Sequence, residues 1–131
     1  MGKVRLLLDT HTLLWWAFDS PRLSKRARAL LADPANTLLV SAASAWEIST
    51  KHRLGRLPEA AVLVQDMLGW FAEVGLTELP ITVAHAQRAG GLAGEHKDPF
   101  DRMLAAQSLE EDVPVLGNDP LVGALGAALV W

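Results

Sequence analysis

The chain has 131 residues, of which 50% are hydrophobic and 21% are charged, and its formal net charge is −3. This length predicts one domain spanning residues 1–131, and this composition excludes a mainly disordered chain. The absence of cysteine excludes disulfide bonds, thiolate nucleophiles and zinc sites that need sulfur ligands.

In chain order, the hydrophobic pattern predicts a strand at 4–8, helices at 13–18 and 24–32, a strand at 37–41, helices at 43–54 and 60–74, a strand at 76–79, helices at 83–89 and 99–111, and strands at 113–116 and 127–130. Strands that alternate with helices at this spacing indicate β-α-β units. We therefore predict an α/β fold, a three-layer α/β/α domain with a central, mostly parallel sheet.

The apolar stretches predict neither export nor membrane insertion. Asp9 and His11 interrupt the apolar run 4–18, so we expect no secretory signal. The charge-free stretches 35–46 and 120–131 are too short to cross a bilayer. We expect a cytoplasmic protein with no membrane partner.

Charge is distributed unevenly along the chain. Residues 1–56 hold nine lysines and arginines against four acids, a formal charge of +5, whereas residues 57–131 hold three against eleven, a formal charge of −8. A weakly acidic chain is a poor candidate for nucleic-acid binding as a whole, but a basic face on one half is compatible with it.

Five carboxylates lie at predicted strand ends or at the starts of the helices that follow: Asp9, Glu47, Asp98, Asp101 and Asp119. In open α/β sheets, ligands bind outside the carboxyl ends of the strands. Carboxylates gathered there without neighbouring cations are costly unless they share protons or hold a cation. Oxygen ligands without cysteine favour a hard cation, Mg²⁺ or Mn²⁺.

Each carboxylate also has a purely structural interpretation. The stretches 44–47 and 98–101 match capping boxes, in which the acid at the third helical position bonds the backbone. Asp98 and Asp119 both precede proline, which is typical of an N-cap, and Asp9 is also placed to cap a helix. These interpretations remain open beside the metal-binding one.

The remaining polar and aromatic side chains give weaker signals. Lys51 lies four residues after Glu47, so it either pairs with that acid or contacts a phosphate. Arg102 either contacts a bound ligand or pairs with a neighbouring acid. The four histidines lack metal-ligand spacing and are expected on the surface or in loops. The segment 13–18 is apolar all round, which predicts a helix covered by the sheet and by another chain.

Three sequence blocks carry a family resemblance: LLLDTH at 6–11, VSAASAWEI at 40–48 and DPFDRMLAAQ at 98–107. In their order and spacing they resemble the PIN-domain ribonucleases, and most closely the VapC-type toxins of toxin–antitoxin pairs. The resemblance implies an endoribonuclease that hydrolyses RNA with one or two Mg²⁺ or Mn²⁺ ions. It also implies a VapB-like antitoxin as partner and a homodimer.

The resemblance assigns roles residue by residue. Asp9 and Asp101 correspond to acids that ligate the metal directly, and Glu47 and Asp119 to acids that act through water. Thr10 and Asp98 are auxiliary. The family usually has Thr or Ser two residues before the fourth acid, whereas this chain has Gly117. A missing hydroxyl there would weaken support for the metal or for water.

The basic half of the chain then predicts where an RNA backbone binds, namely at Lys25, Arg26 and Arg28, with Lys51 and Arg102 as further candidates. Two alternatives stay open. One is a PIN nuclease that processes RNA or cleaves DNA without an antitoxin. The other is a degenerate PIN domain that binds RNA or protein without cutting; Gly117 favours it, and the retention of all four acids opposes it.

Overall fold

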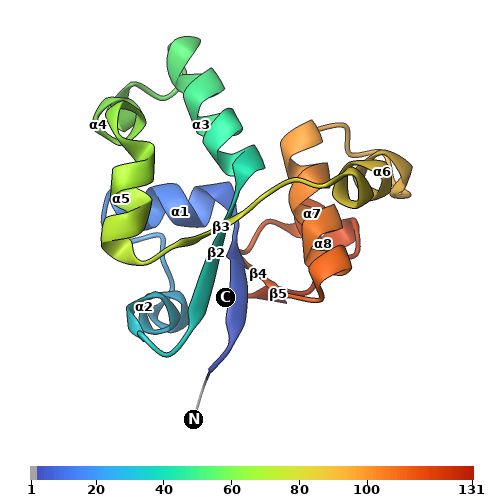
Figure 1. The fold of residues 1–131 in the computed structure, drawn as a ribbon, viewed down its shortest axis with the longest axis horizontal. Coiled ribbons are helices and arrows are strands. Elements are labelled where there is room, and N and C mark those ends of the chain that lie inside the picture. Colours follow the sequence, from blue (N-terminus) through green and yellow to red (C-terminus); the bar gives the residue numbers. More distant parts are fainter. Residues whose placement is uncertain (1–2) are drawn as a thin grey trace.

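The computed structural model describes residues 3–131, in which a twisted sheet of short strands lies between two layers of helices (Figure 1). The strands are β1 (Arg5–Leu8), β2 (Thr37–Ser41), β3 (Thr77–Leu79), β4 (Val115–Leu116) and β5 (Leu129–Val130). The helices are α1 (Thr10–Ala17), α2 (Lys25–Ala32), α3 (Ala42–Arg53), α4 (Ala61–Gln65), α5 (Met67–Val74), α6 (Val83–Gly91), α7 (Pro99–Glu111) and α8 (Pro120–Ala124), with a 3-10 turn, η1 (Pro58–Ala60).

The sheet has the strand order β3-β2-β1-β4-β5, and every pairing is parallel. This confirms the predicted three-layer α/β/α fold. β1 is the central strand, and Leu7 is in register with Leu39 of β2 and with Val115 of β4. The chain moves outward from β1 through β2 to β3 and then returns to the other side of β1 with β4, so the strand order reverses at β1.

Alternating side chains of β1 divide the core between the two helical layers. Leu6 and Leu8 pack with buried residues of α1, α2 and α3 on one face. Leu7 packs with α7 and α8 on the other face, where Leu104 and Val122 are fully buried. Both faces of the strand are covered, which explains why it is a continuous apolar run rather than an alternating one.

The predicted helix 60–74 is wrong, because the chain turns at Asp66. The backbone there has φ −147° and ψ 66°, which no helix accommodates, and it separates α4 from α5. The Asp66 carboxylate accepts a hydrogen bond from the Gly69 amide at 3.0 Å and caps α5. The apolar pattern continued across a capping residue, so periodicity alone did not reveal the break.

The last part of the chain also differs from the prediction. The strand predicted at 113–116 begins at Val115, because the Val113 amide bonds to Ser108 at the end of α7 instead of to a neighbouring strand. The hydrophobic pattern did not predict helix α8, although Asp119 followed by proline indicated a helix start at this position. Asp119 caps it and Pro120 occupies its first position.

The side of α1 that was expected to contact another chain is covered in part by residues of the same chain. Trp16 packs on Trp70 of α5 and Trp15 on Trp131, each with ring centroids 5.7 Å apart in edge-to-face geometry. These contacts account for both tryptophans without another chain. The homodimer stays a prediction.

One histidine contradicts the expectation that all four lie on the surface or in loops. His85 of α6 is 1% exposed, accepts a hydrogen bond from the Thr82 amide at Nδ1, and bonds Glu111 through Nε2 at 2.8 Å. His85 completes the capping box of its own helix. Metal-ligand spacing, by which the histidines were judged, does not detect a capping role.

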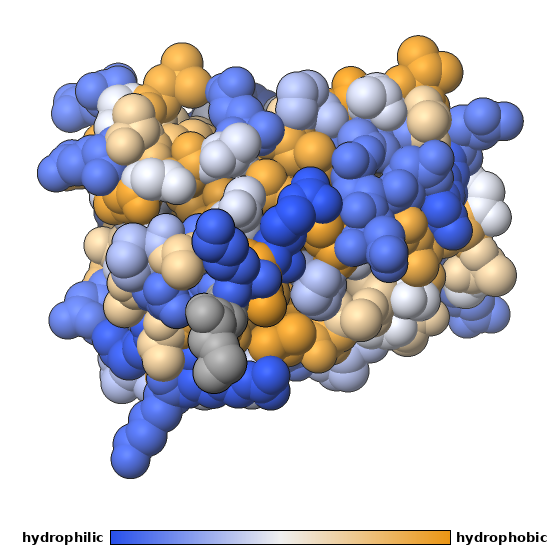
Figure 2. All heavy atoms as spheres, turned by 60° about the horizontal axis from the view of Figure 1, so that its bottom comes forward, coloured by the Kyte–Doolittle hydropathy of each residue, from blue (hydrophilic) through white to orange (hydrophobic). Residues whose placement is uncertain are grey.

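The outer surface is mixed in character. On the face that includes the N-terminal side of the molecule, apolar side chains form small groups among charged and polar ones (Figure 2). Within residues 3–131, none of the helices combines the length and the apolar character needed to cross a bilayer.

Candidate active site

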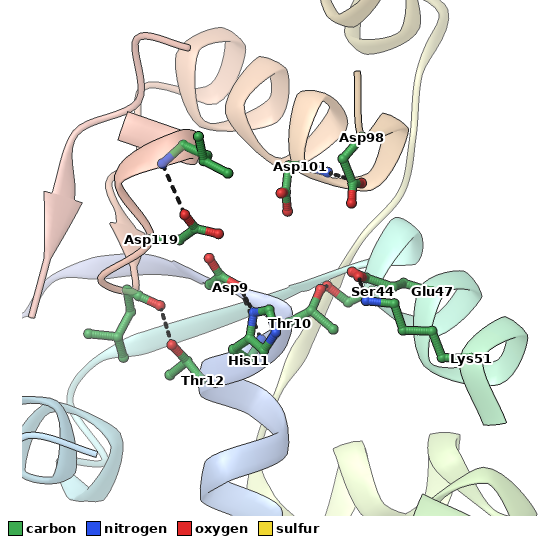
Figure 3. Close-up of polar contacts among 12 residues, drawn as sticks. Asp9, Thr10, His11, Thr12, Ser44, Glu47, Lys51, Asp98, Asp101 and Asp119 are labelled. Carbon is green, nitrogen blue, oxygen red and sulfur yellow. Dashed lines mark hydrogen bonds and ion pairs between the residues drawn. The ribbon is translucent and has the colours of Figure 1, made fainter. Parts of the chain in front are cut away.

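The predicted acids gather at the carboxyl edge of the sheet, around the end of β1 (Figure 3). Asp9 follows β1 and Asp119 follows β4, while Glu47 lies on α3, the helix after β2. Asp98 and Asp101 begin α7 and face the same region. The site therefore lies where the strand order reverses, the position at which open α/β sheets bind ligands.

Asp9 is both a helix cap and a buried, half-satisfied carboxylate. Its side chain is 2% exposed, and Oδ1 accepts a hydrogen bond from the His11 amide at 3.0 Å, which caps α1. Its Oδ2 is buried without a hydrogen-bond partner. The His11 imidazole also faces this carboxylate, with Nδ1 3.6 Å from Asp9 Oδ1. This side-chain contact raises the pKa of the imidazole, and burial opposes that shift.

Glu47 is also buried, with one oxygen unpaired. It is 3% exposed; Oε2 accepts a hydrogen bond from Lys51 Nζ at 2.5 Å, and Oε1 has no partner. The capping-box interpretation is wrong, because α3 begins earlier and Ser41 caps it through the Ala43 amide. The pairing interpretation of Lys51 is confirmed.

The two aspartates at the start of α7 have different partners. Asp98 Oδ1 accepts hydrogen bonds from the Phe100 and Asp101 amides, which confirms it as the N-cap. Asp101 Oδ2 instead bonds His96 Nε2 at 2.8 Å. Burial raises the pKa of Asp101, the charges of Asp98, Asp9 and Glu47 raise it further, and the hydrogen bond from His96 opposes them.

Asp119 caps α8 through the Leu121 amide at 2.9 Å, so its structural interpretation is confirmed as well. A cap uses one carboxylate oxygen, however, and the other remains available. Capping and ligand binding are therefore compatible in Asp9, Asp98 and Asp119.

Two small residues around Asp9 support it. The Thr10 hydroxyl lies 2.9 Å from the Ser44 hydroxyl, a buried contact that joins α1 to α3. Gly117 lies against Asp9, and a Cβ at this position would come within 2.8 Å of the Asp9 Cβ and 3.1 Å of its Oδ2. Where the family usually has Thr or Ser, this chain has Gly117, and the missing side chain lets the end of β4 pack closely against Asp9.

Of the candidate RNA-binding cations, Lys51 lies at the acids, where it pairs with Glu47, whereas two arginines are bonded elsewhere in the chain. Arg102 donates to the backbone carbonyls of Ala89, Leu92 and His96 at 2.6–3.0 Å, so the expected pairing with a neighbouring acid is wrong. Arg28 donates to Asp19 at 2.8 Å and to the Ser20 carbonyl.

Lys25 and Arg26 are exposed on α2, which lies beside the N-terminal part of the sheet, away from the carboxylate edge (Figure 1). RNA binding by these side chains stays a prediction.

Sequence reasoning placed His96 on the surface or in a loop, with substrate contact as the alternative, and did not predict its contact with Asp101. It lies in the loop before α7, five residues ahead of Asp101, and no helical or strand periodicity connects the two. The one available signal was a histidine a few residues before an acid in the first turn of a helix.

The donor set fits a hard cation in its chemistry. Of the buried side-chain oxygens and nitrogens in residues 3–131, two lack a hydrogen bond, Asp9 Oδ2 and Glu47 Oε1, and both lie at this edge. A buried carboxylate oxygen without a partner is costly, and a cation removes that cost. The acids are nevertheless not pre-assembled: in the described part of the chain no three Asp, Glu or His side chains lie close enough together to form a metal site.

Comparisons with known proteins agree with this arrangement. The family model named PIN domain matches residues 6–121. Ribonuclease VapC16 of Mycobacterium tuberculosis is 38% identical over 77 residues, and the match covers 54% of this chain and about half, 55%, of that protein.

Solved structures show the same fold at low sequence identity. VapBC2 from Rickettsia felis, bound to a promoter DNA fragment, has a TM-score of 0.70 at 17% identity and covers 97% of this chain and 98% of its own. FitAcB from Neisseria gonorrhoeae has a TM-score of 0.61 at 21% identity, with 96% of each chain covered. The family match covers all five acids, most of β1 and the strands β2 to β4 with the helices between them, and the chain belongs to the PIN domain family.

Proposed function

We propose that this chain is a metal-dependent endoribonuclease that hydrolyses RNA phosphodiester bonds. The observation that carries the proposal is the pair of buried, unpartnered oxygens, Asp9 Oδ2 and Glu47 Oε1, at the edge where Asp101 and Asp119 also lie. Support comes from the PIN family match and from the ribonuclease name of the relative in Mycobacterium tuberculosis.

The proposed site residues are the four acids and the groups that hold them. Asp9 and Asp101 would hold Mg²⁺ or Mn²⁺ directly, with Glu47 and Asp119 acting through water, and with Thr10 and Asp98 as auxiliary residues. When bound, such a cation lowers the pKa of water and offsets the negative charge that develops on the phosphate. The number of ions, one or two, is part of the proposal.

The chain's own residues would then position the reactants. Glu47 and Asp119 orient a water whose oxygen attacks the phosphorus atom. The bond from phosphorus to the leaving ribose oxygen breaks, and that oxygen takes up the proton that the attacking water loses. Lys51, held by Glu47, and His96, held by Asp101, fix the orientations of these two acids.

Cleavage of single-stranded RNA and of DNA with the same sequence tests this proposal. With purified, partner-free protein and Mn²⁺, we expect cleavage of RNA and none in excess EDTA. Mn²⁺ should also raise the melting temperature, because a ligand that binds only the folded state stabilises it. RNA left intact with Mn²⁺ present contradicts the enzyme, and cleavage of DNA alone supports the DNA-directed alternative.

We propose further that the enzyme is the toxin of a type II toxin–antitoxin pair and forms a homodimer. The similar structures are complexes named VapBC2 and FitAB, whose names pair a toxin-like chain with a second protein. An apolar groove of about 360 Å³ between α3, α5 and β3, lined by Met67, Leu68 and Phe71 among others, suits an antitoxin segment. Expression should arrest growth, and a small neighbouring gene should relieve the arrest; growth without arrest contradicts the toxin proposal.

A PIN domain that binds without cutting is the second candidate. The ion pair of Glu47 with Lys51 and the hydrogen bond between Asp101 and His96 favour it, because they occupy oxygens that a metal needs. Stoichiometric RNA binding without cleavage at any Mn²⁺ concentration would select this candidate over the enzyme.

A further inference from the structure

Trp46 is the exception among the five tryptophans of the chain. Its side chain is 61% exposed, whereas Trp15, Trp16, Trp70 and Trp131 are half-buried and pack against the core. A large indole held in solvent contributes little to folding. Its position therefore calls for another explanation.

Trp46 lies directly beside the candidate active site. It precedes Glu47 on α3, and Phe100 precedes Asp101 on α7. The two rings meet edge-to-face, with centroids 4.9 Å apart and planes at 82°. The aromatic pair thus bridges the two helices that each carry a predicted metal-binding acid.

The surface next to this pair is apolar and offers no free cation. A small cavity of about 210 Å³ adjoins the rings and is lined by Ala43, Ile81 and Met103. The one charged side chain that lines it is Arg102, and its guanidinium is already bonded to three backbone carbonyls. Such a surface suits the flat face of a base rather than a phosphate.

We propose that Trp46, braced by Phe100, stacks on a base of the RNA next to the scissile phosphate. The inference rests on the proposed ribonuclease function. A strand whose phosphate lies at the acids carries its neighbouring nucleotides over the adjoining helices, and α3 and α7, which carry Glu47 and Asp101, are two of these helices. Single-stranded RNA presents unstacked bases, and aromatic side chains bind them by stacking with little dependence on base identity.

Steady-state kinetics on a short RNA oligonucleotide with Mn²⁺ test the proposal. For Trp46→Ala we expect KM to rise roughly tenfold while kcat stays within about twofold, since base stacking contributes to binding. Trp46→Phe keeps an aromatic face and should recover most of the loss. Val62→Ala truncates another exposed apolar side chain, on α4, and should leave both constants unchanged.

Abasic substitutions in the oligonucleotide separate stacking from a structural role of Trp46. When one abasic position is moved along the RNA, we expect one site at which KM of the wild type rises roughly tenfold. At that site KM of Trp46→Ala should not rise further. An unchanged KM for Trp46→Ala overturns the proposal. So does normal RNA cleavage by this variant together with weakened binding of a protein partner, which would assign the aromatic pair to that partner.

Binding without cleavage distinguishes failure of this inference from failure of the nuclease proposal. Fluorescence anisotropy of labelled RNA with Asp9→Asn protein measures binding alone. RNA cleavage that does not depend on Trp46 contradicts only the stacking. Trp46-dependent binding by a wild type that cuts no RNA supports the stacking and contradicts the nuclease.

Discussion

Asp9 combines a stabilising and a destabilising role in one side chain. One of its oxygens caps α1, a contact typically worth about 1 kcal/mol, while the other is buried without a partner, which costs roughly 1–3 kcal/mol or more for a charged group. Folding alone does not favour a charged side chain here. The arrangement is explained by a ligand that satisfies the second oxygen.

Gly117 determines how closely β4 approaches Asp9. In Gly117→Ala the new Cβ would meet the Asp9 Cβ at 2.8 Å, so the aspartate or the strand must move. We expect a loss of about 1–3 kcal/mol in the free energy of unfolding, as in other overpacked sites, together with reduced RNA cleavage. Urea unfolding and a cleavage assay measure the two effects.

Gly91 at the end of α6 provides the matched control. A Cβ there meets nothing within 4 Å, so Gly91→Ala should stabilise the protein by about 0.4–1 kcal/mol and leave cleavage unchanged. If Gly117→Ala unfolded and cleaved RNA like wild type, the close packing on Asp9 would have no functional meaning.

At the scale of elements, periodicity predicted most helices and strands, and local backbone chemistry decided the exceptions. The central strands and α7 appear close to their predicted bounds. Asp66 breaks the predicted helix 60–74 because its carboxylate caps α5, and its apolar neighbours conceal the turn. Helix α8 is five residues long, too short for a periodic pattern to reveal it.

Arg102 ties the loop before α7 to α6, and that loop carries His96. Because lysine cannot reproduce three hydrogen bonds from one planar group, we expect Arg102→Lys to lower the free energy of unfolding by about 2 kcal/mol. Hydrogen exchange of the amides in 92–97 should accelerate. Arg88→Lys alters a surface pair with Glu110 and should change stability by less than about 1 kcal/mol. Unchanged hydrogen exchange in Arg102→Lys would contradict the view that the three hydrogen bonds of Arg102 hold this loop in place.

At the scale of the whole molecule, sequence reasoning brought the acids to one edge and predicted that Lys51 pairs with Glu47, but it did not predict the contacts that depend on the tertiary fold. The parallel sheet and the position of Asp9 after the first strand follow from the β-α-β pattern, whereas the strand order comes from the structure. The ion pair of Asp101 with His96 depends on the path of a loop, and the packing of Gly117 on Asp9 depends on strand register. Neither leaves a periodic signal in the chain.

The charge asymmetry also changes meaning in three dimensions. Arg28 bonds within the chain and Lys51 pairs with Glu47, so part of the basic excess of residues 1–56 serves the fold. Part of the negative charge belongs to the candidate active site, where a divalent cation would offset two charges. The net charge of −3 therefore does not oppose an RNA substrate.

The most direct measurement is RNA cleavage with Mn²⁺ by wild type and by Asp9→Asn, each checked by thermal unfolding. Asparagine retains an oxygen for the His11 amide and removes the unpaired buried charge, so we expect a melting temperature without Mn²⁺ equal to or above that of wild type. Cleavage should fall by at least about 100-fold, because removing a ligand from a charge-stabilising site costs several kcal/mol in the transition state. Cleavage by folded Asp9→Asn within a few-fold of wild type would contradict the account.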